Sequence, residues 1–260
     1  MSQYGTRYAE LYDTFYAEKP YAGEAAFIHG LLGKHAARDI RRVLELACGT
    51  GSHAFALEEL GYQVIATDGS SAMLDRALGK ARQRRSSVEF QLKDMRSLDF
   101  PEQSFDAALC LFDSIGYVVT DDGLSEALDG VYRVLRPGGL FVFEFWHALA
   151  MLGCYDPLRI RESEHDGGHL IRVSVTNLEK GRRVARVNYL TYELDRDGHC
   201  DNFEEIHLNR FFTVEEASEW LARSSFEPVK WFAGFTEDEQ ISDETWHVVA
   251  LARRPSSPTS

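Results

Sequence analysis

The chain has 260 residues, of which 44% are apolar and 12% aromatic, enough for a packed core, so a disordered or fibrous protein is excluded. The 28 Lys and Arg residues against 41 Asp and Glu residues give a formal net charge of −13. This charge repels a phosphate backbone, so we expect no nucleic-acid partner.

No segment reaches the roughly 18 to 20 apolar residues that a membrane span requires. The first residues also lack a basic and then apolar export signal, so we expect a cytoplasmic protein without a membrane partner. The four cysteines, Cys48, Cys110, Cys154 and Cys200, lie far apart and form no Cys/His cluster at zinc-ligand spacing. We therefore expect reduced thiols and no metal site.

An N-terminal helical cap is predicted over residues 1–35, because apolar residues recur at helical spacing from position 25 after an aromatic-rich opening. A short apolar strand at 43–47 follows and ends in the loop Cys48-Gly-Thr-Gly51. The next apolar positions predict a helix that ends at Gly61. This order is strand, glycine loop and helix.

The same alternation continues along the chain. We predict strands at 64–67, 88–92 and 106–112, a serine-capped helix from about residue 71 to 81, and a second helix at about 123–135. Arg136-Pro-Gly-Gly139 predicts a turn into an apolar strand at 140–145. Strands that alternate with helices indicate an α/β fold, a Rossmann-like parallel sheet with helices on both faces. Ligands of such sheets bind beyond the carboxyl ends of the strands.

A different pattern follows, with long β-rich runs at 170–176, 184–193 and 203–211. We predict an antiparallel β insertion over residues 150–212, which serves as a lid or as the surface of a homodimer. The segment Thr213-Val-Glu-Glu216 predicts a capping box and a helix to about residue 224. Strands near 229–235 and 246–252 complete a core made of residues 36–149 and 213–254. The tail at 255–260 is expected to be disordered.

Two features of the core indicate a ligand that contains adenosine. Gly49 and Gly51 let the backbone approach a ligand at the positive end of a helix, although a purely structural turn is the alternative. Asp68 can accept hydrogen bonds from both hydroxyls of a ribose, and its alternative role is an Asx turn or helix cap. These features alone do not distinguish a nicotinamide cofactor from S-adenosylmethionine.

Four short segments occur in order at strand ends or turns: Glu45-Leu-Ala-Cys-Gly-Thr-Gly51, Asp68, Lys93-Asp-Met-Arg96 and Arg136-Pro-Gly-Gly139. With them the chain resembles class I S-adenosylmethionine-dependent methyltransferases over about residues 40–147. Tyr12-Asp13, Asp113-Ser-Ile-Gly-Tyr117, Glu144-Phe-Trp146 and the β-rich insertion are similar to bacterial N-methyltransferases of nucleotide-linked amino sugars. Those enzymes have a histidine where this chain has Tyr117.

The resemblance implies S-adenosylmethionine as the cofactor and a position for each part of it. Gly49 and Gly51 would face the methionyl part, Asp68 would hold the ribose, and Asp94 with the Met95 backbone would contact the adenine. The remaining implied cofactor contacts are Tyr12, Tyr21, Glu45, Ala47, Gly69, Met73, Leu111 and Phe112. Asp94 as a turn cap and Met95 as core filler are the structural alternatives.

Methyl transfer mainly requires that the acceptor, the methyl carbon and the sulfur lie in line. An acceptor that must lose a proton needs a nearby base, and the candidates are Tyr12, Tyr117 and His147. Tyr117 and Trp146 are candidate acceptor contacts, while His207 and Arg210 could hold an anionic group from the lid. In the structural alternatives, Tyr117 and His147 pack in the core, and His207 and Arg210 form salt bridges with Glu204 or Glu205.

The basic cluster Arg76, Lys80, Arg82, Arg84 and Arg85 is interpreted as a solvated helix end. The sequence thus predicts a methyltransferase that acts on nitrogen or oxygen of a small, polar, anionic metabolite, with a nucleotide-linked amino sugar as the first candidate. A non-catalytic S-adenosylmethionine-binding module and a nicotinamide-dependent oxidoreductase are the alternatives. The pair Asp94-Met95 argues against the oxidoreductase.

Overall fold

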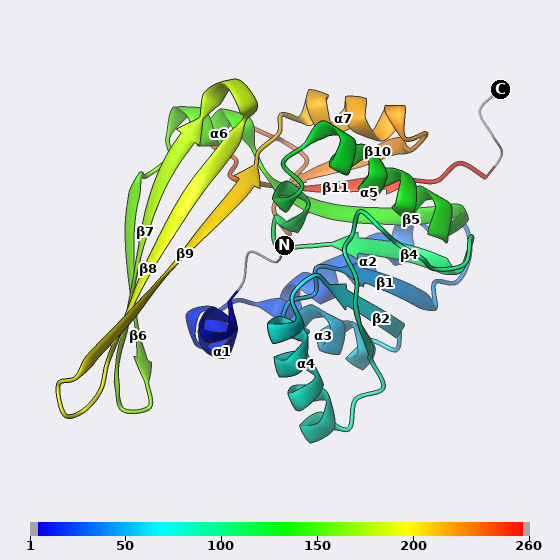
Figure 1. The fold of residues 1–260 in the computed structure, drawn as a ribbon. Coiled ribbons are helices and arrows are strands. Elements are labelled where there is room, and N and C mark those ends of the chain that lie inside the picture. Colours follow the sequence, from blue (N-terminus) through cyan, green and yellow to red (C-terminus); the bar gives the residue numbers. More distant parts are fainter. Residues whose placement is uncertain (1–4, 257–260) are drawn as a thin grey trace.

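Two β-sheets organise the chain in the computed structural model, which describes residues 5–256 (Figure 1). Across the seven-stranded sheet the order is β10 (Glu227–Ala233), β11 (His247–Arg253), β5 (Leu135–Trp146), β4 (Phe105–Cys110), β1 (Arg42–Leu46), β2 (Gln63–Asp68) and β3 (Glu89–Leu92). The five strands from β5 to β3 run parallel. At one edge, β11 pairs antiparallel with β5, and β10 pairs antiparallel with β11, so β11 alone is reversed in this sheet. All carboxyl ends of the parallel strands therefore lie at one edge of the sheet.

Helices cover both faces of this sheet. Helices α2 (Tyr21–His35), α3 (Ser52–Glu59) and α4 (Ser71–Arg84) contribute to the hydrophobic core on one face. Helices α5 (Asp121–Val134) and α7 (Val214–Arg223) pack on the opposite face (Figure 1). Because alternate strand residues point to opposite faces, Val43 belongs to the first core and Leu44 to the second. The predicted α/β fold is confirmed.

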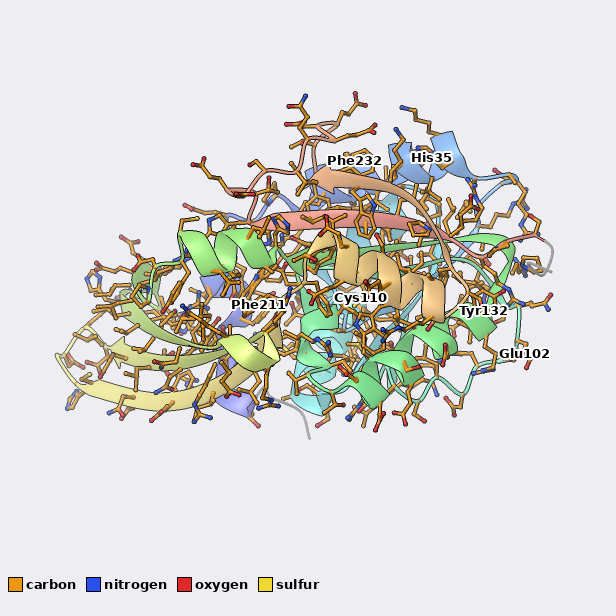
Figure 2. All side chains as sticks on the ribbon, turned by 90° about the horizontal axis from the view of Figure 1, so that it is seen from above. His35, Glu102, Cys110, Tyr132, Phe211 and Phe232 are labelled. Carbon is orange, nitrogen blue, oxygen red and sulfur yellow. The ribbon has the colours of Figure 1, made fainter. Side chains whose placement is uncertain are left out.

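A second, antiparallel sheet lies beside the first (Figure 1). It contains β6 (Leu158–His165), β7 (Gly168–Glu179), β8 (Val184–Leu194) and β9 (Cys200–Arg210), in that order. We call it the lid sheet. Helix α1 (Thr6–Phe15) lies between the lid sheet and the core and packs against Leu170 and Met73. Helix α6 (Ala148–Gly153) packs against the lid sheet near Phe211. Phe211 is fully buried where the lid sheet meets the core, whereas Glu102 lies at the outer edge of the core (Figure 2).

Local chemistry explains where several elements begin. The hydroxyl of Ser70 accepts a hydrogen bond from the Met73 N–H at the start of α4. The predicted capping box is present at α7, where Thr213 accepts from the Glu216 N–H and Glu216 accepts from the Thr213 N–H. All four cysteines are free, and no helix within residues 5–256 is long and apolar enough to cross a membrane.

Three sequence predictions need correction. The segment 136–139 is not a turn before a strand, because β5 already begins at Leu135 and passes through Gly138, whose φ is +79°. The lid has a fourth strand, β6, which the sequence analysis missed because its charged residues interrupt the apolar pattern. Helix α6 was missed as well, and from residue 257 onward the predicted tail lies outside the described residues.

Candidate active site

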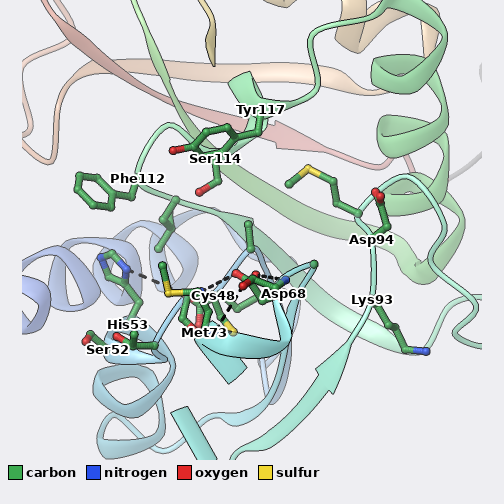
Figure 3. Close-up of a pocket in the computed structure, with 18 of the residues that line it drawn as sticks. Cys48, Ser52, His53, Asp68, Met73, Lys93, Asp94, Phe112, Ser114 and Tyr117 are labelled. Atoms are coloured by element: carbon green, nitrogen blue, oxygen red, sulfur yellow. Dashed lines mark hydrogen bonds and ion pairs between the residues drawn. The ribbon is translucent and has the colours of Figure 1, made fainter. Parts of the chain in front are cut away.

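A cavity of about 280 Å³ lies at the carboxyl ends of β1, β2 and β4 (Figure 3). We call it the glycine-loop cavity. Twelve of the thirteen predicted cofactor contacts line it: Tyr12, Tyr21, Glu45, Ala47, Gly49, Asp68, Gly69, Met73, Asp94, Met95, Leu111 and Phe112. The structure therefore brings together residues that are up to a hundred positions apart in the sequence.

Gly51 is the predicted residue that does not line this cavity. It caps α3 with a φ of +81°, and a Cβ atom built there would lie 2.8 Å from the Phe90 ring. A left-handed backbone and a close ring both favour glycine at this position. Gly51 thus shapes the loop, and its contact with the methionyl part of the cofactor stays a prediction.

Asp68 is buried at the base of the cavity (Figure 3). Its Oδ2 accepts a hydrogen bond from the Gly49 N–H at 2.8 Å, and its Oδ1 accepts one from the Ser70 N–H at 2.7 Å. Burial raises the pKa of this carboxyl group, and the two amide hydrogen bonds oppose that rise. The contact with Ser70 also realises the predicted Asx turn, so the same carboxylate holds the loop and faces the cavity.

Glu45 is a second buried acid at this edge of the sheet. Burial and the nearby Asp68 raise the pKa of Glu45 to about 8. Its Oε2 atom is buried and has no hydrogen-bond partner within residues 5–256. Close by, His53 bonds to Glu24 with an Nε2–Oε2 distance of 2.6 Å. The sequence analysis missed His53, although it lines the cavity, since a helix residue after a glycine loop gave no separate signal.

Asp94 and Met95 combine the predicted and the alternative roles. Both line the cavity, but Asp94 also accepts hydrogen bonds from the Arg96 N–H and Nε, each at 2.9 Å. This contact lowers the pKa of the Asp94 carboxyl group. Met95 packs against the hydrophobic core as well.

The N-terminal helix is tied to the glycine loop by Asp13. Its carboxylate accepts a hydrogen bond from the Thr50 hydroxyl at 2.6 Å and two from the Lys80 ammonium at 3.0 Å. Lys80 was expected at a solvated helix end, and that interpretation is wrong for this residue. Because Tyr12 precedes Asp13, this link places Tyr12 at the cavity wall.

A second cavity of about 450 Å³ lies between the core and the lid sheet. We call it the lid cavity. Phe112 and Tyr117 line both cavities and therefore lie at their junction. The predicted contacts Trp146 and His207 line the lid cavity too. The Tyr117 hydroxyl lies 3.1 Å from His207 Nδ1, and His207 Nε2 lies 3.1 Å from Glu205 Oε2.

Besides Gly51, two predicted residues line neither cavity. His147 is buried at the start of α6, where its Nδ1 has no partner within residues 5–256 and burial lowers the pKa of the imidazole. Arg210 bonds to Asp121 at 2.6 Å and lies over the rings of Phe212 and Trp220. The expected roles of His147 as a base and of Arg210 as an anion contact do not fit these positions.

The floor of the lid cavity holds a cluster that the sequence did not reveal. His247 Nδ1 lies 3.0 Å from Asp113 Oδ2 and 3.2 Å from Glu144 Oε1, and both acids are buried. The carboxylate of Asp113, with that of Glu144, raises the pKa of His247 to about 11, so the imidazole is protonated. Glu144 also accepts the Phe112 N–H at 2.6 Å, where Phe112 and Asp113 both have a φ of +56°. Burial and the nearby Asp113 raise the pKa of Glu144. The cluster thus sets two acidic groups against one imidazolium and holds a strained turn between the cavities.

Comparison with known proteins identifies the family. A family model described as a methyltransferase domain matches residues 43–139. Glycine N-methyltransferase of Mus musculus is 33% identical over 221 residues, which cover 77% of this chain and 73% of the relative. A dTDP-3-amino-3,4,6-trideoxy-alpha-D-glucopyranose N,N-dimethyltransferase of Streptomyces venezuelae is 33% identical over 145 residues, or 55% of this chain and 59% of the relative.

Solved structures agree with this result. A S-adenosylmethionine-dependent methyltransferase of Clostridium acetobutylicum has the same fold, with a TM-score of 0.83, 20% identity and coverage of 96% of this chain and 98% of that chain. An amino pentose methyltransferase of Micromonospora echinaspora, solved with S-adenosylmethionine bound, gives a TM-score of 0.75 and 25% identity over 98% and 99% of the two chains. The chain therefore belongs to the S-adenosylmethionine-dependent methyltransferases of the Rossmann-like class, and S-adenosylmethionine is its cofactor.

Proposed function

We propose that the enzyme transfers a methyl group to an amine nitrogen of a small, polar, anionic metabolite that occupies the lid cavity. The observation that carries this proposal is the wall of Phe112 and Tyr117 common to both cavities. A cofactor in one cavity and an acceptor in the other would meet at this wall. A nucleotide-linked amino sugar is the first candidate, since relatives that act on amino sugars cover most of the chain.

In this proposal the residues of the glycine-loop cavity hold the cofactor. Asp68 binds the ribose hydroxyls, Asp94 and the Met95 backbone contact the adenine, and Gly49 lies against the methionyl part. The unpartnered Oε2 of Glu45 supports a cationic or hydrogen-bond-donating group of the ligand beside it. Bound S-adenosylmethionine supplies a methyl group that is already activated on a sulfonium, so the chain needs no acid to release it.

The floor cluster of the lid cavity supports an amine rather than a hydroxyl acceptor. Asp113 and Glu144 set two acidic groups against the single imidazolium of His247. An excess of acidic groups next to the shared wall favours an amine acceptor group. Asp113 follows Phe112 directly, so the favoured position of the amine is close to the reacting methyl group.

Tyr117 and His207 supply a path for the amine proton. The Tyr117 hydroxyl accepts the proton and passes its own to His207 Nδ1 across 3.1 Å, while Glu205 holds the Nε2 side of the ring. Tyr12, whose pKa burial raises, stays neutral and acts only as a hydrogen-bonding wall of the cofactor cavity.

The experiment begins with a thermal-shift titration of S-adenosylhomocysteine beside NAD and NADP. A ligand at 100 times its dissociation constant stabilises a protein by about 2.7 kcal/mol, so a selective shift is easily measured. S-adenosylmethionine is then supplied with amino-sugar nucleotides and with matched sugars that carry a hydroxyl in place of the amine. We expect methylated product, detected by mass spectrometry, only from the amine. Methylation of the hydroxyl analogue alone would refute the nitrogen acceptor.

A further inference from the structure

Arg172, on β7, is a buried arginine without a counter-ion. It is 4% exposed and lines the lid cavity. Its guanidinium donates to the hydroxyls of Tyr8 at 2.8 Å and Tyr16 at 3.2 Å, and no carboxylate within residues 5–256 forms an ion pair with it. Its Nε has no hydrogen-bond partner there. A buried charge is costly unless it is paired, so this guanidinium calls for an anion.

The strand register places more positive charge beside Arg172. Arg161 on β6 is directly opposite Arg172, and Arg159 lies two residues away on the same face. Like charges directly opposite each other across antiparallel strands destabilise a sheet. On the other side of Arg172, Thr191 is its register partner on β8, and the buried Thr191 hydroxyl is unpartnered in the described part of the chain.

The neighbouring groups do not neutralise this charge. Arg172 lies over the rings of Phe15, Tyr16 and Tyr189, which are contacts with neutral groups. Asp156 lines the same cavity, but it accepts the Leu158 N–H at 3.1 Å and forms no ion pair with these arginines. The aromatic rings hold the Arg172 side chain in place. They do not compensate the second positive charge, that of Arg161, on the neighbouring strand.

We propose that Arg159, Arg161 and Arg172 form an oxyanion subsite in the lid cavity, which binds a phosphate or diphosphate group. Planar guanidinium groups match phosphate oxygens in pairs, and three of them fit a group with several anionic oxygens better than a single carboxylate. Thr191, the register partner of Arg172, is fully buried and does not line the cavity, so it stands behind the three arginines. Nothing in the sequence analysis pointed to these residues.

The subsite adds a substrate class to the proposed function. The identity of the group that occupies the subsite rests on that proposed function. The lid wall of the cavity carries Arg159, Arg161 and Arg172, whereas its floor carries Asp113 and His247, which is also ion-paired to the buried Glu144. An acceptor with a phosphate at one end and an amine at the other would therefore bind in one direction only. That orientation brings the amine to the floor next to the shared wall.

The test uses sodium pyrophosphate as the probe and the full chain as the protein. Trp146 and Trp246 line the lid cavity, so binding is followed by tryptophan fluorescence and checked by calorimetry at constant ionic strength. Sodium acetate serves as the carboxylate probe. We expect pyrophosphate to bind more tightly than acetate, and Arg161→Met and Arg172→Met each to weaken it about tenfold or more.

Arg161 lies on an edge strand and has no ion-pair partner in residues 5–256, so Arg161→Met should fold even if Arg172→Met does not. Arg186→Met is the matched control, because Arg186 is exposed on the same sheet and lines neither cavity. Unchanged pyrophosphate binding in Arg161→Met, an equal loss in Arg186→Met, or acetate binding as tight as pyrophosphate would each overturn the subsite.

A titration with S-adenosylhomocysteine separates this failure from failure of the proposed function. If S-adenosylhomocysteine binds every variant and pyrophosphate binds none of the proteins, the subsite is wrong and the methyltransferase proposal stands. If an amine that carries a phosphate is methylated equally well by the wild type and Arg161→Met, the subsite has no role in acceptor binding and the inference fails.

Discussion

The two cavities differ in how their charged groups are balanced. In the glycine-loop cavity, the Asp68 carboxylate is held by two backbone amides, so the protein itself stabilises the charge. In the lid cavity, Arg172 donates to tyrosine hydroxyls and faces Arg161, and the acids of the floor share one imidazolium. The first cavity thus holds its charged group by itself, whereas the proposed acceptor would complete the charges of the second.

The largest effect is expected on the floor of the lid cavity. His247→Gln should lower the free energy of unfolding by about 3 kcal/mol at pH 7, because two buried carboxylates lose their cation. The pKa of His247 is raised from 6.5 to about 11, so its contribution is complete below pH 6.5 and is lost as the pH rises towards 11. Urea unfolding at pH 8, 9 and 10 should therefore show a shrinking difference from the wild type.

The surface variant His169→Gln provides the control, because His169 pairs with Glu162 where both side chains are exposed. It should change stability by less than about 0.5 kcal/mol. An equal loss of unfolding free energy in both variants would show that the floor cluster stabilises the protein no more than a surface ion pair does.

The next effect concerns the shape of the glycine loop. Gly51→Ala should cost roughly 2 to 3 kcal/mol of stability, from the left-handed backbone and from the Phe90 ring 2.8 Å from the new Cβ. Gly61→Ala is matched, since Gly61 has a φ of +93° but no atom within 4 Å of a built Cβ. We expect it to cost only about 1 kcal/mol by thermal unfolding. Equal costs would show that the Phe90 contact is unimportant.

A smaller effect is expected on cofactor affinity. Asp68→Ala should weaken S-adenosylhomocysteine binding by about 2 kcal/mol, or roughly 30-fold, because charge-assisted hydrogen bonds are lost. Calorimetry with Asp75→Ala, an exposed acid on α4, gives the comparison. Affinity that stays the same in Asp68→Ala would remove Asp68 from the cofactor site.

The smallest effect is expected at the wall that the cavities share. Tyr117→Phe should lower turnover by about 1 kcal/mol, or roughly fivefold, since the hydroxyl bonded to His207 is lost. Affinity for S-adenosylhomocysteine should be unchanged, because the ring remains in place. A wild-type rate would assign Tyr117 a structural role, and a loss of cofactor affinity would place its hydroxyl in the other cavity.

The cofactor side could be predicted because its chemistry is local in the sequence. Gly49 follows β1 and Asp68 is the last residue of β2, and the carboxyl ends of parallel strands meet at one edge. The acceptor side depends on contacts between distant segments. His147 was chosen because it follows β5, but the register of β11 places His247 beside Trp146 at that edge. The pairing of Arg161 with Arg172 could not be predicted, since β6 itself was not recognised.

One feature of helix α1 bears on how ligands would leave the two cavities. Tyr12 lines the glycine-loop cavity and Tyr16, one helical turn later, lines the lid cavity, with their rings 4.8 Å apart. Asp13, between them, is anchored to Thr50 and Lys80. A rigid helix that swings away from the core removes a wall from both cavities at once. Departure of the spent donor and of the finished product would then share a single gate, and rupture of the Asp13 anchor would limit the turnover rate.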